Sequence, residues 1–336
     1  MIWLTWRQFR VQFVAALVVL AALAGYLVVL GRSIRHSYNS DILGCVAANG
    51  CSLSQVEARF VQDYAGPVRV SGVLLMVVPA IIGLFWATPM ITRELETDTH
   101  RLVWNQSVTR TRWLAVKLTL VGLFGVAATG AASLGLTWAA SRFDQVEGNR
   151  FLAIDFASRN LTPLGYAAFA FALGIAVGLL VRRTVPAMAI TLAVIAVVQF
   201  AIPIAARPHL RAPVTASVPY TSAVPDDRGG FLKIPGPGRP VEIEGYTIPG
   251  ALMLTSSAAL LDSAGRQVVS DQLRQCLLRD PRKTQDCVAR LNLHFRVSYQ
   301  PANRYWSFQM LEFGGFVVLA VLLVGVSLWW IRRIRG

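Results

Sequence analysis

Six stretches of this chain, each 18 to 23 residues long, contain no charged residue. A helix of about 20 apolar residues crosses the hydrocarbon core of a bilayer, which is roughly 30 Å thick. Uncharged runs of this length, repeated along one chain, argue against buried helices of a soluble protein and predict six transmembrane helices. The runs are Phe13–Leu30, Val70–Met90, Leu118–Ala140, Leu161–Val181, Thr184–Ala206 and Phe313–Ile331.

The connections between the runs set the predicted fold class. We expect an all-α polytopic membrane protein of six transmembrane helices, with an extracytoplasmic α+β domain between the fifth and sixth spans. Residues 1–206 would hold the first five spans, residues 207–308 the extracytoplasmic domain, and residues 309–336 the last span and a cytosolic tail. Residues 1–12 combine tryptophans with arginines, which suits a short helix at the membrane interface.

The extracytoplasmic segment changes character along its length. VEIEGYTI (241–248) alternates between apolar and polar residues like a strand. Residues 267–280 have apolar residues at helical spacing, and Pro281 can open a second helix. The segment is therefore predicted to contain both strands and helices.

Basic residues indicate how the chain is oriented. An even number of spans places both termini on one side of the membrane. If that side is the cytosol, the short inner segments hold 12 of the 32 basic residues and only three of the 18 acidic residues. This excess of basic over acidic residues in short inner segments agrees with the positive-inside rule. We therefore expect a multi-pass protein of the bacterial cell membrane with both termini in the cytosol. The net charge of +14 follows from this topology, so no nucleic-acid partner is predicted.

The cysteines support the same orientation. The chain has four, and all of them fall in the proposed outer segments. An even number confined to an oxidising space is typical of disulfides. Their spacing favours the pairs Cys45–Cys51 and Cys276–Cys287, with a bridge between the two loops or four unrelated thiols as the alternatives. A zinc site is disfavoured because only His294 lies near the second pair.

The chain lacks the motifs of an enzyme. It has no GxxxxGK[ST] phosphate loop, HExxH or GxSxG motif, and no Cys/His cluster at metal-ligand spacing. The predicted spans also lack the ionisable residues that ion-coupled transporters need in the membrane. Glu312 is the nearest candidate, and we interpret it as a polar helix start. No catalytic, cofactor-binding or metal-binding residue is predicted, so a partner must supply any energy.

The stretch RELETDTHRLVWNQSVTRTRW, residues 93–113, is unusually polar for an inner connection. Thr97, Asp98 or Thr99 can cap a short helix over residues 97–105, lying across the inner mouth of the protein. The alternative is a solvated loop, which would not explain the acidic and apolar residues within it.

This stretch resembles the membrane subunits of type-2 ABC exporters. In that family a Glu-rich turn after the second span leads into a short coupling helix, a Ser-Arg turn and a lysine in the third span. The matching residues are Arg93–Thr99, His100–Asn105, Ser107–Arg110 and Lys117, with Asp98 where the family usually has glycine. LTWRQFRVQ (4–12) and SYQPANRYWSFQMLE (298–312) look like the actinobacterial branch of such permeases.

The resemblance implies a permease subunit that works as a dimer with two copies of a separate ABC ATPase, on which ATP and Mg bind. The complex would move an amphiphilic or hydrophobic substrate outward, with membrane lipids around it. Glu94 and Glu96 are expected either to pair with basic ATPase residues or to brace the base of the third span. The residues implied to couple the permease to the ATPase are Glu94, Glu96, Thr99, Arg101, Leu102 and Trp104.

Other functions remain open on the sequence alone. A membrane-anchored sensor or mechanotransmission subunit of an ABC complex would use the same inner stretch without transport. An importer would need a soluble binding partner, and a membrane enzyme would need polar groups in the spans. Small residues along the third span suit close helix packing. They are Gly122, Gly125, Ala128 and Gly130.

Overall fold

The computed structural model describes residues 2–48, 51–97, 109–222, 224, 229–276 and 281–333. The chain divides into two compact units, which we call the helix bundle and the sheet domain. The helix bundle comprises Met1–Gly148, Leu152–Ile204 and Trp306–Gly336. The sheet domain comprises Asn149–Phe151 and Ala205–Tyr305.

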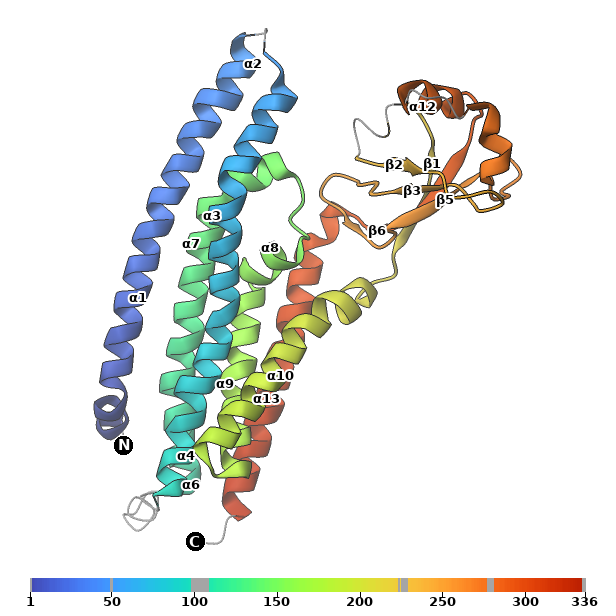
Figure 1. Ribbon diagram of the computed structural model, residues 1–336. Helices are drawn as coiled ribbons and strands as arrows, with labels where there is room; N and C mark the ends of the chain where they lie inside the picture. Colours follow the sequence, from blue (N-terminus) through green and yellow to red (C-terminus); the bar gives the residue numbers. More distant parts are fainter. Residues whose placement is uncertain are drawn as a thin grey trace. The chain divides into compact units, whose positions relative to one another are not determined.

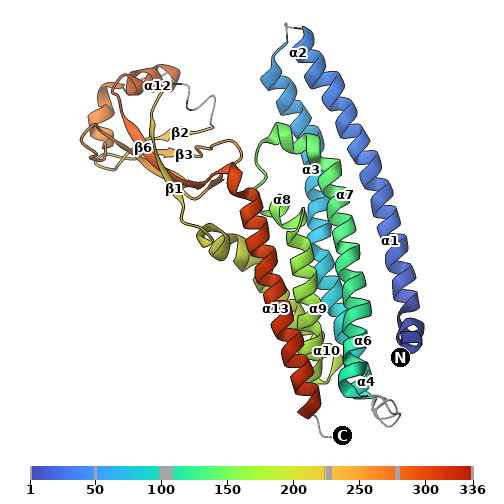
Figure 2. The ribbon, with the colours of Figure 1, turned by 180° about the vertical axis from the view of Figure 1, so that it is seen from behind.

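Within the described residues, six helices of the chain are long and apolar enough to cross a membrane, as the sequence predicts. Figures 1 and 2 show these helices running alongside one another. The long helices are α1 (Ile2–Ser37), α3 (Leu53–Ile81), α7 (Leu123–Glu147), α9 (Thr162–Val181), α10 (Thr184–Ala201) and α13 (Tyr305–Arg333). The shorter helices are α2 (Gly44–Ala48), α4 (Thr88–Glu96), α6 (Arg110–Lys117) and α8 (Ala153–Ser158).

The second and third spans are each longer than one helix. A π-helical stretch, Ile82–Ala87, joins α3 to α4, so the second span extends over Leu53–Glu96. Another, Leu118–Gly122, joins α6 to α7 in the third span. Such π-helical insertions in otherwise regular helices are frequent at functional sites.

The first predicted loop, between the first two spans, is mostly helical. α1 runs to Ser37, a π-helical stretch and α2 continue to Ala48, and α3 starts at Leu53. The helices persist here because they bury a shared apolar cluster beyond the uncharged windows, and this burial outweighs the charged residues on their other faces. The cluster includes Ile34, Ile42, Phe60, Val68 and Phe143. An uncharged window therefore marks the membrane-crossing part of a helix, not its ends.

α9 is the most enclosed of the spanning helices. In its most apolar window 72% of the residues are buried, against 11% for the first span. It packs against α3, α4, α7 and α10. Close approach depends on glycine, because a Cβ added at Gly174 would lie only 2.6 Å from the carbonyl oxygen of Gly83. In the third span, a Cβ added at Gly122 would lie 2.8 Å from the Phe171 ring. Gly122 is one of the small residues at which the sequence predicts close helix packing.

The sheet domain is built on antiparallel strands. Its six-stranded sheet has the order β1-β6-β5-β3-β2, and β4 pairs with β6. The buried side chains of Ile243, Leu260, Phe295 and Val297 form its core. The strands are β1 (Val214–Pro219), β2 (Phe231–Lys233), β3 (Glu242–Glu244), β4 (Leu252–Met253), β5 (Ser257–Leu261) and β6 (His294–Gln300).

The sheet domain differs from the sequence prediction in two elements. The strand predicted over 241–248 is shorter, because the backbone turns at Gly245, where φ is +75°. For residues 267–276, the predicted α-helix is wrong in type, because a 3₁₀ helix covers Ser270–Cys276; residues 277–280 of the same prediction lie outside the described residues. Three residues per turn place Ser270, Leu273 and Cys276 on one buried face. The second helix predicted in this segment is present, and α12 covers Pro281–Ala289.

Candidate functional site

The predicted coupling stretch lies at one end of the helix bundle. α4 ends and α6 begins at the end where both chain termini lie, which we call the near end; the opposite end is the far end (Figures 1 and 2). Of the predicted coupling residues, Glu94 and Glu96 are described, both on α4. Thr99, Arg101, Leu102 and Trp104, and the helix predicted over 97–105 beyond Thr97, lie outside the described residues.

Glu94 joins the second span to the base of the third. The Lys117 ammonium donates to Glu94 Oε1 at 2.5 Å, and the Trp113 indole donates to Glu94 Oε2 at 3.1 Å. The Lys117 side chain is only 4% exposed, and its Nζ also donates to the carbonyl oxygen of Met90 at 3.3 Å. The same ammonium lies 4.5 Å from the centre of the Trp113 ring, at cation–π distance. Glu94 is expected either to pair with basic residues of the ATPase or to brace the base of the third span, and these contacts correspond to the second role.

Glu96 makes a different connection. Its carboxylate accepts hydrogen bonds from the Thr184 backbone N–H at 2.9 Å and from the Thr184 hydroxyl at 2.6 Å. Thr184 is the first residue of α10, so an anion here satisfies an otherwise unpaired N–H and complements the helix dipole. Glu96 therefore links the second span to the fifth, not to the third.

A row of threonines adds to this connection, and sequence analysis missed it. The Thr92 hydroxyl lies 2.8 Å from that of Thr184, and the Thr88 hydroxyl lies 3.5 Å from that of Thr191. Thr88, Thr92 and Thr191 are fully buried. The sequence signal that could have revealed this contact is the spacing of Thr88 and Thr92, four residues apart and therefore on one face of α4.

The far end holds a second charged cluster, also missed. Arg159 forms ion pairs with Asp144 and with Asp155, the latter at 2.7 Å. Both side chains of the Arg159–Asp155 pair are 3% exposed. Burial raises the pKa of the Asp155 carboxyl, although the Arg159 charge acts in the opposite direction. These residues fall in a connection that the sequence assigned to a short loop.

Glu312 does not start the last span, so our interpretation of it is wrong. α13 begins at Tyr305, and Glu312 lies inside it, 5% exposed. The Tyr166 hydroxyl donates to Glu312 Oε1 at 3.2 Å, which joins the sixth span to α9. One helical turn earlier, Gln309 accepts hydrogen bonds from the backbone N–H groups of Leu161 and Thr162. Gln309 and Glu312, both inside α13, thus bind the first two turns of the fourth span.

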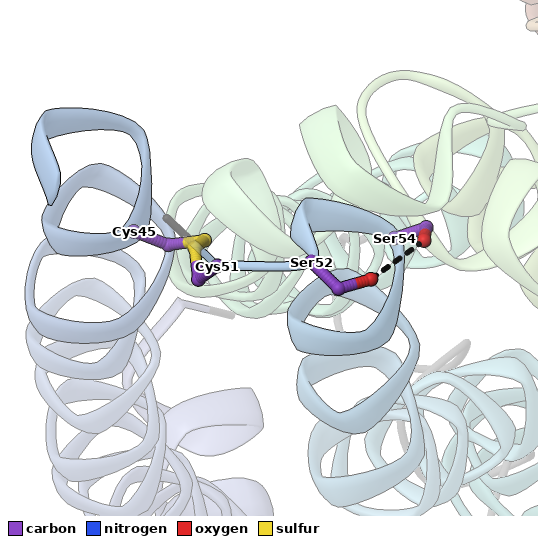
Figure 3. Close-up of a disulfide and its surroundings, with 4 residues drawn as sticks. All are labelled: Cys45, Cys51, Ser52 and Ser54. Carbon is purple, nitrogen blue, oxygen red and sulfur yellow. Dashed lines mark hydrogen bonds between the residues drawn. A yellow bond between two sulfur atoms is a disulfide. The ribbon is translucent and has the colours of Figure 1, made fainter. Parts of the chain in front are cut away.

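The cysteines pair within each loop in the structure. Cys45 and Cys51 are joined with their Cα atoms 5.6 Å apart, where α2 approaches the start of α3 (Figure 3). Cys276 and Cys287 are joined at a Cα separation of 5.4 Å. Both separations lie in the usual range for disulfides, about 4.4–6.8 Å. The oxidised state of these cysteines in the cell stays a prediction.

Comparison with known proteins adds to these observations. A family model described as ABC-2 membrane transporter related matches residues 17–207, which cover most of the first five candidate spans and more than half of the chain. No curated protein and no solved structure matches the chain. Among the described residues, no group of three or more His, Cys, Asp or Glu side chains could hold a metal ion. This multi-pass membrane protein belongs to the ABC-2 membrane transporter related family.

Proposed function

We propose that the chain is the permease subunit of an ATP-driven ABC exporter in a bacterial cell membrane, with both termini in the cytosol. Two copies of the permease would pair, and two copies of a separate ATPase would bind ATP and Mg beneath them. The family supports a membrane subunit that works with an ABC ATPase. The actinobacterial branch of the family stays a prediction.

The attachment of α4 at the near end carries this proposal. Immediately before the coupling stretch, Glu94 is bonded to Lys117 and Trp113 in the third span, and Glu96 is bonded to Thr184 in the fifth. A force applied to residues 97–105 would therefore act on the second, third and fifth spans together. This arrangement suits a lever that converts closure of an ATPase dimer into movement of the spans.

The cargo class follows from the spans themselves. Each candidate span contains an 18-residue window with a mean hydropathy of 1.7 or more. A path between such helices offers few partners for a strongly polar molecule. We therefore propose an amphiphilic or hydrophobic cargo.

The proposal is tested by substituting the stretch expected to enter the ATPase. The permease and its ATPase would be reconstituted in liposomes, and ATP hydrolysis and export of a fluorescent amphiphile measured together. We expect Leu102→Asp and Trp104→Ala to abolish export while the protein still folds and reaches the membrane. An aromatic anchor buried at an interface typically contributes about 2 kcal/mol or more to binding.

Trp138→Ala provides the matched control, because Trp138 is an exposed tryptophan of α7 far along the chain from the coupling stretch. It should leave ATP hydrolysis and export unchanged. Normal coupling in both near-end variants would contradict the proposed role of residues 97–105. ATP hydrolysis without export of any amphiphile by the wild-type complex would instead favour a sensor or mechanotransmission subunit.

A further inference from the structure

Two adjoining cavities lie between α1 and the second and third spans. The first has a volume of about 270 Å³ and reaches Arg93, Glu94 and Lys117 at the near end. The second has a volume of about 350 Å³ and extends along α1 toward the middle of the bundle. Gln12 and Trp86 line both cavities, so the two adjoin, the first forming a polar end of this space and the second an apolar end.

The residues that line the polar end carry one positive charge in excess. Glu94 neutralises Lys117 at a distance of 2.5 Å. Arg93 is exposed and lies near enough to Glu96, outside the lining, for their charges to interact, but among the described residues no ion pair or side-chain hydrogen bond holds its guanidinium. The Gln12 side chain is also exposed and can donate hydrogen bonds through its amide. A group with a single negative charge would complement this end.

The apolar end is formed by small residues on facing helices. Ala15 and Ala16 of α1 lie on one side, and Ala128 and Ala132 of α7 lie on the other. Apart from Gln12 and Thr129, its lining consists of apolar and tryptophan side chains. Its lining follows successive turns of α1 from Gln12 to Leu23. An acyl chain matches such a lining.

The helices around this space are locally irregular. Ile82 and Trp86 belong to the π-helical stretch of the second span, and Val121 belongs to that of the third. All three side chains line the cavities. π-Helical insertions are rare and occur frequently at functional sites. This observation is independent of the charges and points to the same place.

We infer that this space binds a monoanionic amphiphile with one acyl chain, taken from the membrane leaflet at the near end. The anionic head would pair with Arg93 and accept from Gln12, and the chain would lie between α1 and α7. The inference rests on the proposed function and narrows its cargo class. It also assigns Gln12 and Arg93 to ligand recognition.

The test is a binding measurement on the permease alone, purified in nanodiscs of neutral phosphatidylcholine. Dansyl-undecanoate, an anionic fluorescent amphiphile, would be titrated, with its uncharged amide as the second probe. We expect Arg93→Gln to weaken binding of the anion about tenfold or more, as removal of a hydrogen bond to a charged group does. The same substitution should leave binding of the amide unchanged, and Arg93→Lys should restore most of the affinity for the anion.

Matched variants separate this site from general membrane effects. Arg112→Gln removes another exposed arginine near the same end, on α6, that does not line the cavities. Ala16→Phe fills the apolar end, whereas Ala22→Phe adds the same side chain to an exposed position of α1 outside it. We expect Ala16→Phe to weaken binding of both probes and the two control variants to bind like wild type.

Each outcome has a clear meaning. Equal affinity in Arg93→Gln and Arg112→Gln, or in Ala16→Phe and Ala22→Phe, would overturn the inference even if the reconstituted complex exports amphiphiles. A change in oligomeric state on Ala16→Phe, with unchanged probe affinity, would mean that a second copy of the chain fills the space, and this also overturns it. Specific binding in a complex that exports nothing would leave the site in place and contradict the proposed function.

Discussion

At the far end of the helix bundle Arg159 is enclosed with Asp144 and Asp155, whereas at the near end Lys117 is enclosed with Glu94 and Trp113. The far-end groups all lie between residues 144 and 159, in the connection from the third span to the fourth. Both side chains of the Arg159–Asp155 pair are 3% exposed. The near-end groups lie on either side of the coupling stretch, and the Glu94 side chain is 16% exposed. Asp144 of the far-end cluster is 12% exposed, close to the value for Glu94, so the clearest difference is Glu96, which is exposed at the surface of the near end.

The difference indicates which end is built to move. A buried charge that loses its partner is strongly destabilising, so the far-end cluster holds one arrangement. A carboxylate at the surface can exchange its partner for water at little cost. Under the proposed function, Glu96 could therefore adjust its contact as the spans move, whereas Glu94 would keep its bond to the buried Lys117. The predictions below test this contrast in order of decreasing effect on stability.

Arg159→Met should have the largest effect. It leaves Asp144 and Asp155 without their shared cation, and breaking a buried ion pair in this way typically costs about 3–5 kcal/mol. The free energy of unfolding would be measured by equilibrium unfolding in mixed micelles. Arg69→Met is the control: Arg69 pairs with Glu147 nearby but is 49% exposed, so the loss should be about 1 kcal/mol or less. Similar losses of unfolding free energy in both variants would show that the buried ion pairs of Arg159 contribute no more than the exposed ion pair of Arg69.

Glu94→Gln should have a smaller effect at the near end. The substitution keeps an acceptor for Trp113 but removes the charge that faces the buried Lys117, at a cost of about 2 kcal/mol. Adding Lys117→Met should restore part of that stability, because it removes the uncompensated ammonium. The same unfolding measurement applies. A Glu94→Gln variant as stable as wild type would show that the brace does not hold the third span.

The cysteine pair at Cys45 and Cys51 should contribute about 2 kcal/mol, as closure of a short loop predicts. We expect Cys45→Ser to lower the melting temperature, and a reductant to lower that of the wild type at least as much, because it also opens the Cys276–Cys287 bridge. Peptide mapping without reduction should recover the 45–51 and 276–287 bridges. Free thiols, or a bridge between the two loops, would contradict the predicted pairing and the oxidising side assigned to it.

Thr184→Val should change stability least. Glu96 is at the surface, and the variant removes the Thr184 hydroxyl while the backbone N–H remains as a donor. We expect near-normal unfolding but a clear loss of export per ATP hydrolysed in reconstituted liposomes, because the Thr184 hydroxyl no longer bonds to Glu96 and Thr92 and the connection between the second and fifth spans is weakened. Thr191→Val, further along α10, is the comparison. Unchanged coupling in Thr184→Val would restrict force transmission to Glu94 and the third span.

The sequence was most informative where hydrophobicity alone decides structure. Six uncharged windows are sufficient to predict six spans, since the bilayer requires that length of apolar helix. The type and order of strands were less predictable, because strand ends depend on turns such as the one at Gly245. Lys117 was identified through family resemblance, but its enclosure with Trp113 depends on how α4 and α6 meet. No pattern in the sequence fixes that contact.

The partners of charged residues were the hardest to predict. Arg159 and Asp155 are four residues apart on neighbouring turns, but Asp144 joins them only because α7 ends at Gly148 and the chain doubles back. Glu96 could be assigned to coupling from its position, yet its bond to Thr184 joins residues 88 positions apart. Such contacts follow from tertiary packing, which sequence spacing does not record.

α9 must also satisfy the requirements of membrane insertion during synthesis. In the two-stage view, a hydrophobic segment enters the bilayer as a separate helix before its neighbours pack around it. α9 therefore has to be apolar enough to dissolve in lipid, with a window of mean hydropathy 2.2, although 72% of that window ends up against protein. Its sequence serves both steps. Aliphatic and aromatic side chains on every face allow insertion, and Gly174 leaves the space that Gly83 and Thr88 occupy once the helices assemble.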